Sequence, residues 1–259
     1  MKKIPVLMDC DPGHDDAMAI ILALSSEKLN VLGITSACGN QTIEKTTKNA
    51  RSICEFLGRR DIPIAQGRKA PLLTSVYTAG IAHGDSGLDE PVAPLQEMSA
   101  VEFMAQQLEK SEAPVVIVPT GPLTNVATLI LCYPHLIEKI DKIVLMGGSI
   151  VSGCSGRGAS EFNIMVDSYA ADIVYTSGIP IVMMGLDVTN YTTIGFDEKE
   201  KKFVVSEQSE KNISEESPEE TMYRIKIFDK EQKEKFSVEL KGKDTGNSEK
   251  LDPLKSLNY

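Results

Sequence analysis

The sequence lacks an apolar run long enough to cross a membrane, and it lacks an excess of positive charge. With 37 acidic residues against 27 Lys and Arg, its formal net charge is -10. Nucleic acid and anionic membranes are therefore excluded as expected partners, because their phosphates would be repelled. Only Met1-Lys2-Lys3 and five further residues precede Asp9, which is too short for a signal peptide. A cytoplasmic protein is expected.

The sequence also lacks any Cys-x-x-Cys pair and any Cys/His pairing with the spacing of a zinc site. Its five cysteines are odd in number and widely spaced, mostly in apolar surroundings. This distribution is typical of reduced intracellular thiols and excludes a disulfide framework.

Strand-like and helical patterns alternate along the chain as far as about residue 195. The strand-like segments are residues 4–8, 29–36, 114–119, 143–146 and 179–184. The helical segments are residues 16–24, 42–57, 99–110 and 125–131, the second ending before Gly58. The alternation predicts an α/β fold with a single open, mostly parallel (Rossmann-like) sheet flanked by helices.

The composition changes after Phe196, where a Glu-, Lys- and Ser-rich stretch begins. We expect an α/β domain over residues 1–196 and a divergent charged tail over residues 197–259. Residues 206–220 are expected to be disordered or loosely helical. In the tail, Tyr223–Phe228 and Lys235–Leu240 alternate apolar and polar residues, which predicts a β-hairpin.

Four aspartates, Asp9, Asp11, Asp15 and Asp16, lie within eight residues directly after the first predicted strand. Like charges this close repel one another unless they share a cation, and a hard divalent ion with oxygen ligands fits them best. Their place at the carboxyl end of a strand is where open α/β sheets bind ligands.

Other polar residues follow the later strands in the same way. They are Asn40, Thr120, Glu161, Asn163 and Asp187, together with Met146 before Gly147-Gly148. Each alone fits a turn or a helix cap. Their repeated position at strand ends indicates a pocket, and His83 is a candidate contact from the loop over residues 67–98.

These motifs occur together in one order: Asp9-Cys-Asp-Pro-Gly-His-Asp-Asp16, Gly39-Asn40, His83-Gly-Asp-Ser-Gly87, Pro119-Thr-Gly-Pro-Leu-Thr-Asn125, Met146-Gly-Gly148 and Glu161-Phe-Asn163. In order and spacing the set resembles the inosine-uridine nucleoside hydrolase family. The resemblance covers about residues 1–195.

The resemblance implies hydrolysis of the N-glycosidic bond of ribonucleosides, with one bound Ca²⁺. It implies Asp11 as general base and calcium ligand, and Asp16 and the backbone carbonyl of Thr120 as further calcium ligands. For the substrate it implies contacts from Asp15, Asn40, His83, Met146, Glu161 and Asn163. It also implies a homo-oligomer, a dimer or tetramer.

The chain departs from the family pattern near its end. Family members carry a late His-Asp pair, but no histidine follows His135 here. Asp252, in Leu251-Asp252-Pro253, is the remaining candidate for the aspartate as a calcium ligand. The missing histidine leaves open a catalytically impaired homologue that binds Ca²⁺ and ribose. A phosphotransferase of the haloacid dehalogenase type also stays open, because Asp9-Cys10-Asp11 after one strand and Thr120 after another resemble its nucleophile and phosphate contacts.

Overall fold

The computed structural model of the chain describes residues 2–76, 93–150, 160–190, 192–197, 202–207, 221–228 and 234–242. It divides into two compact units. The first holds the described residues up to Ser149 and those from 160 to Met184, and the second holds Ile150 and the described residues from Gly185 onward. His83 and Asp252 lie outside the described residues.

The first unit is built on a six-stranded sheet with the strand order β3-β2-β1-β4-β5-β6. Every neighbouring pair is parallel. The strands are β1 (Ile4–Cys10), β2 (Leu29–Ser36), β3 (Ile64–Gln66), β4 (Val115–Pro119), β5 (Ile140–Met146) and β6 (Ile181–Met184). The predicted α/β fold with an open parallel sheet is confirmed.

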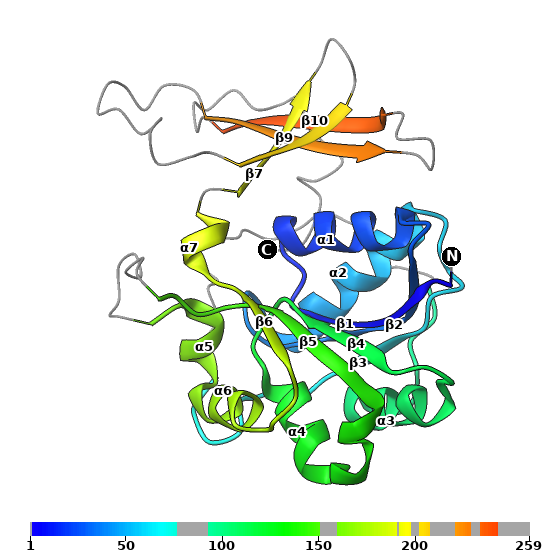
Figure 1. Cartoon of the computed structure of the whole chain (residues 1–259), viewed down its shortest axis with the longest axis vertical. Coiled ribbons are helices and arrows are strands. Elements are labelled where there is room, and N and C mark those ends of the chain that lie inside the picture. The colour runs from blue at the N-terminus through cyan, green and yellow to red at the C-terminus, as the bar shows by residue number, and fades with distance from the viewer. Residues whose placement is uncertain are drawn as a thin grey trace. The chain divides into compact units, whose positions relative to one another are not determined.

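Helices cover both faces of this sheet (Figure 1), as parallel strands require. The helices are α1 (His14–Ser25), α2 (Ile43–Phe56), α3 (Ala100–Lys110), α4 (Thr124–Cys132), the 3₁₀ helix η1 (Pro134–Lys139), α5 (Phe162–Val166) and α6 (Ser168–Tyr175). α1 and α2 lie on one face, and α3, α4 and α6 lie on the other. None of the described helices is both long and apolar enough to cross a bilayer.

The alternation of side chains along β1 gives the sheet two cores. Val6 and Met8 pack into the cluster under α1 and α2. Leu7 between them packs on the opposite face, in the cluster that includes Phe103 of α3 and Leu129 of α4. A strand buried on both faces explains the unbroken apolar run that precedes Asp9.

The largest differences from the sequence prediction are short elements. β3 has three residues, too few to show a period, and Asp61 and Pro63 beside it resemble a loop. α5 and α6 were not predicted, since they have five and eight residues and follow one another directly. α1 begins at His14, two positions before the predicted Asp16, so both Asp15 and Asp16 belong to its first turn.

The second unit contains the short helix α7 (Leu186–Thr189) and a four-stranded sheet in the order β7-β8-β10-β9. Its strands are β7 (Thr192–Asp197), β8 (Lys202–Glu207), β9 (Thr221–Phe228) and β10 (Glu234–Gly242). β9 and β10 pair antiparallel over the two segments predicted as a hairpin. β7 spans the domain boundary expected at residue 196.

The expected disorder from residue 206 onward is wrong at its start. Ser206 and Glu207 belong to β8, where they pair antiparallel with Thr193 and Thr192 of β7. The preceding Phe203-Val-Val205 is a run with high strand propensity, which carries the strand into the polar residues that follow. Residues 208–220 lie outside the described residues.

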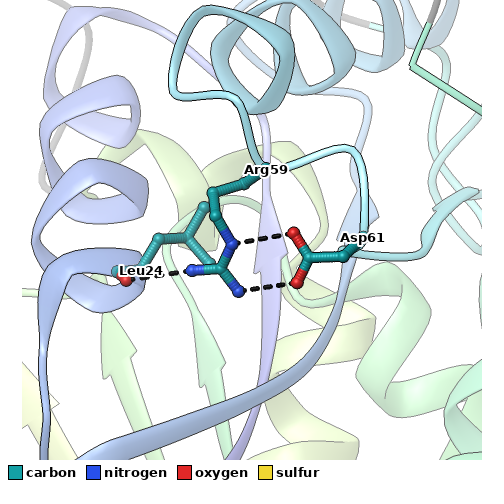
Figure 2. Close-up of polar contacts among 3 residues, drawn as sticks. All are labelled: Leu24, Arg59 and Asp61. Carbon is teal, nitrogen blue, oxygen red and sulfur yellow. Dashed lines mark hydrogen bonds and ion pairs between the residues drawn. The ribbon is translucent and has the colours of Figure 1, made fainter.

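An exposed ion pair closes the turn after α2, at the amino-terminal edge of the first sheet (Figure 2). The Arg59 guanidinium donates to both carboxylate oxygens of Asp61, at 2.8 Å each. It also donates to the carbonyl oxygen of Leu24 near the end of α1, at 3.1 Å. The pair thereby links the end of α1 to the loop that leads into β3, at the edge opposite the strand ends described below.

Replacing Phe103 by Ala should remove the largest fully buried side chain of the first unit. We expect the free energy of unfolding of the Phe103→Ala variant to be lower by about 3–5 kcal/mol, because the substitution removes buried apolar area and leaves a cavity. Urea unfolding followed by far-UV circular dichroism measures the loss. Phe56→Ala is the control, because Phe56 is 72% exposed. Equal midpoints for the two variants would contradict the assignment of the core.

Candidate active site

The acidic cluster lies at the point where the strand order of the sheet reverses. From β1 the chain proceeds outward through β2 and β3 on one side, then returns to form β4, β5 and β6 on the other. The chain leaves β1 and β4 toward opposite faces of the sheet, where α1 and α4 lie. In open α/β sheets, ligands usually bind at such a point. Asp11 follows β1 at this point, and Thr120 follows β4.

Asp11 is 1% exposed and is held from two sides. Its Oδ2 accepts a hydrogen bond from the backbone N–H of Asn40 at 2.7 Å, and its carbonyl oxygen accepts one from Asn40 Nδ2 at 3.2 Å. Gly39 and Gly121 pass so close to the carboxylate that a Cβ on either would overlap it. The two glycines thus allow the loops after β2 and β4 to enclose Asp11.

Asp16 connects the same cluster to the loop after β4. Its Oδ1 accepts a hydrogen bond from the Thr120 hydroxyl, and its Oδ2 accepts one from the backbone N–H of Gly13 at 3.4 Å. Asp16 is 2% exposed, whereas Asp15 beside it is exposed. Both lie in the first turn of α1, where the positive end of the helix dipole favours carboxylates.

Glu161 and Asn163, at the start of α5, form the other wall of the site. Glu161 caps the helix, accepting from the backbone N–H groups of Asn163 at 2.9 Å and Ile164 at 3.1 Å, and also from Gly148 at 3.0 Å. Asn163 Nδ2 donates to the carbonyl oxygens of Thr120 at 2.8 Å and Met146 at 3.2 Å. The ends of β4 and β5 and the start of α5 are thereby joined.

Burial raises the pKa of each buried carboxyl group in the cluster, and neighbouring charges raise it further for Asp11 and Asp16. Burial first, and then the charge of Asp16, raise the pKa of Asp11 well above its ordinary value. Burial and the charge of Asp15 raise the pKa of Asp16 to about 7. Burial raises the pKa of Asp9 to about 6, against the hydrogen bonds from Thr35 and Asn125. These carboxylates need a positive partner to be ionised together.

The donor set of the site fits a hard cation with oxygen ligands. Asp11 and Asp16 supply two buried carboxylates, and the buried Oδ2 of Asp9 has no hydrogen-bond partner among the described residues. Within that part of the chain, no three His, Cys, Asp or Glu side chains form a metal-binding group. The carbonyl oxygen of Thr120, which accepts from Asn163, is a further oxygen donor at the site.

The structure brings most of the predicted site residues together. Hydrogen bonds link Asp11 with Asn40, Asp16 with Thr120, and Asn163 with Thr120, Met146 and Glu161. Asp187, expected in the pocket, belongs to the second unit, where its carboxylate accepts from the backbone N–H of Ile150 at 2.5 Å. His83 and Asp252 remain predictions, since both lie outside the described residues.

Two buried polar residues close to the site were not predicted as part of it. The sequence pattern places Asn125 at the start of a helix and at the end of the motif that begins at Pro119, without a role in the site, yet its side chain bonds to Asp9. Asp167 accepts from Leu72 N–H at 2.8 Å, the Thr124 hydroxyl at 2.7 Å and Ala170 N–H at 3.0 Å. The signal available for Asn125 was its place in the motif after β4, directly before the apolar residues of α4.

This arrangement agrees with what the chain matches among known proteins. The family model described as "Inosine-uridine preferring nucleoside hydrolase" matches residues 6–246. The chain belongs to this family. The match continues past residue 195, where the resemblance of the motifs ended, and the family is metal-dependent.

Curated relatives and solved structures agree with this membership. The chain is 51% identical over 195 residues to a pyrimidine-specific ribonucleoside hydrolase, RihA, of Shewanella woodyi, covering 73% of this chain. It is 51% identical over 203 residues to RihA of Escherichia coli O1:K1 / APEC, covering 76% of it. A purine-preferring ribonucleoside hydrolase from Gardnerella vaginalis superposes with a TM-score of 0.70 at 32% identity, over 76% of this chain and 65% of that one.

The chain spans only part of the length of these relatives. The match covers 62% of the Shewanella woodyi protein and 65% of the Escherichia coli protein. The family model's match over residues 6–246 includes the acidic cluster after β1 and its partners Asn40 and Thr120.

Proposed function

We propose that this chain hydrolyses the N-glycosidic bond of ribonucleosides to ribose and free base, with Ca²⁺ as its metal. The observation that carries the proposal is the pair of buried carboxylates, Asp11 and Asp16. They lie at the switch point of the sheet, where Thr120 joins Asp16 to Asn163 and Glu161. Membership of the family supports the same chemistry.

In the proposed site, Asp11, Asp16 and the carbonyl oxygen of Thr120 hold the cation, and Asp252 is a further candidate ligand. The Thr120 oxygen accepts from Asn163 and retains a second lone pair. When bound, the cation would act as a Lewis acid, which makes a water molecule easier to deprotonate. Two buried acids and neutral oxygens suit the hard ligand preference of Ca²⁺.

Asp11 acts as the general base. It takes one proton from the attacking water, and the water oxygen forms a bond to C1′ of the ribose. The bond between C1′ and the nitrogen of the nucleobase breaks. Its electron pair leaves with the nucleobase, which then takes up a proton. Because positive charge develops on the ribosyl ring in the transition state, the surrounding carboxylates stabilise it more than they stabilise the bound substrate.

The remaining residues bind and orient the sugar. We assign Asp15 and Asn40 to the 2′ and 3′ hydroxyls, Glu161 and Asn163 to the sugar hydroxyls, and Met146 to packing against the ring. Glu161 and Asn163 are already fixed by backbone hydrogen bonds, so little conformational entropy is lost when they bind a substrate. His83 is proposed as a contact to the base.

A catalytically impaired homologue that binds Ca²⁺ and ribose is the second candidate, because no histidine follows His135 to assist the leaving base. Family membership gives no support to the phosphotransferase alternative.

Release of reducing sugar from uridine, cytidine and inosine tests the proposal. Uridine and cytidine come first, since the two curated relatives are named pyrimidine-specific. We expect release that depends on added Ca²⁺ and stops with a chelator. A chain that is stabilised by Ca²⁺ and ribose but releases no sugar would establish the impaired homologue instead.

We also propose a cytoplasmic location and a dimer or tetramer. The four cysteines in the described part of the chain, Cys10, Cys38, Cys54 and Cys132, are all free thiols, which suits a reducing compartment. Analytical ultracentrifugation would measure the oligomeric state, and a monomer at micromolar concentration would contradict it.

A further inference from the structure

We propose that Asn125 is a positioning residue, which holds the acidic cluster in place through its hydrogen bond to Asp9. The inference rests on the proposed cation site and hydrolase function, and it assigns Asn125 no contact with substrate or metal. It concerns how the carboxyl ends of four neighbouring strands are held in one arrangement.

The Asn125 side chain, on the helix after β4, forms hydrogen bonds near the carboxyl ends of three other strands, β1, β2 and β3. Its Nδ2 donates to Asp9 Oδ1 on β1 at 2.8 Å and to the carbonyl oxygen of Ser36 on β2 at 2.9 Å. Its Oδ1 accepts from the backbone N–H of Arg68, after β3, at 3.0 Å. The residue is 1% exposed, so these bonds do not compete with bulk water.

The segment after β3 comes close enough for the Arg68 N–H to bond to Asn125 because Gly67 precedes Arg68. A Cβ on Gly67 would overlap both the Ser36 carbonyl oxygen and the Asn125 amide group. The amide therefore fills a space shaped by the backbone of β2 and of the loop after β3, and a side chain of another shape would leave polar groups there unpaired.

Asn125 also lies on the segment that presents Thr120 and Gly121 to the cation site. It is the second residue of α4, which follows that turn after β4. Gly121 packs against the Asp11 carboxylate, and the Thr120 hydroxyl donates to Asp16. Fixing the first turn of α4 to Asp9 thus fixes the distance between the loops after β4 and β1, which together form the site.

Asp9 receives its second hydrogen bond from a residue of β2. The Thr35 hydroxyl donates to the same Oδ1 at 2.6 Å. The Asp9 carboxylate is thereby held between β2 and α4, two residues ahead of Asp11 in the chain. A displacement of Asp9 on loss of Asn125 would be transmitted directly along the backbone to Asp11.

The test compares Asn125→Ala with Leu129→Ala in the full chain. Leu129 lies one turn further along α4, is 1% exposed, and belongs to the apolar core. Both variants should lower the unfolding temperature. Only Asn125→Ala should weaken Ca²⁺ binding measured by calorimetry, by about 10- to 100-fold, as for other residues that orient metal ligands. In sugar release from uridine, kcat should fall more than KM rises.

A double variant keeps the inference testable if Asn125→Ala fails to fold. Asp9→Asn combined with Asn125→Asp retains one amide and one carboxylate at the contact, so it should bind Ca²⁺ more tightly than Asn125→Asp alone. Equal Ca²⁺ affinities for the unaltered chain and Asn125→Ala, or equal losses in Asn125→Ala and Leu129→Ala, would overturn the inference. So would the absence of any Ca²⁺ binding by the unaltered chain. Ca²⁺ binding without sugar release would refute the hydrolase function alone, and the affinities would still decide the role of Asn125.

Discussion

Asp11→Asn should reduce kcat for sugar release by at least about 10²- to 10⁴-fold, the range lost with a general base. The fold should survive, because an amide oxygen can still accept the hydrogen bond from the Asn40 N–H. The fall in kcat comes from the lost proton transfer, because an amide cannot take a proton from water at neutral pH. Steady-state kinetics on uridine with saturating Ca²⁺ measures the effect.

Asp61→Asn is the matched control for this experiment. It removes the same single charge, but Asp61 is an exposed partner of Arg59 at the opposite edge of the sheet (Figure 2). Its activity should equal that of the unaltered chain, since an exposed ion pair contributes little to stability. If Asp11→Asn retained a tenth or more of the activity, Asp11 would not be the base.

Asp16→Asn should have opposite effects on stability with and without a cation. In the presence of chelator, the free energy of unfolding should rise by on the order of 1–3 kcal/mol. The substitution removes a charge from a position that is 2% exposed, beside Asp15 and Asp11. This gain should exceed the loss of the long 3.4 Å bond from the Gly13 N–H.

With Ca²⁺ added, the order of stability should reverse. The unaltered chain gains about 2.7 kcal/mol when free Ca²⁺ reaches about 100 times its dissociation constant. Asp16→Asn should lose most of this gain, because one of the two buried carboxylates is missing. Thermal unfolding of both proteins, in chelator and in Ca²⁺, measures the two effects.

Asp172→Asn serves as the comparison, since Asp172 is exposed on α6 and its charge lies outside the acidic cluster. It should leave both unfolding temperatures unchanged. An Asp16→Asn variant that is less stable in chelator, or that keeps the full stabilisation by Ca²⁺, would contradict the proposed role of Asp16.

Local sequence was sufficient for the long elements and for most of the site. The period predicted α2 within residues 42–57, before Gly58, and α3 within residues 99–110, where Ser99 in fact caps the helix in a capping box with Glu102. The local sequence pattern did not predict β3, α5 or α6, whose few residues show no clear period. In these places tertiary packing, and not local preference, stabilises the element.

The sequence by itself determined that acidic and amide side chains follow the strands of a parallel sheet, because that information lies in the order of apolar and polar residues. Only the tertiary structure decided which strand ends are neighbours. The strand order reverses between β1 and β4, so two residues after β4 reach the cluster: Gly121 lies against Asp11, and the Thr120 hydroxyl donates to Asp16. It also showed that Asn125 bonds to Asp9, 116 positions away. Contacts between strand ends depend on how the chain crosses over the sheet, and no local pattern in the sequence records that path.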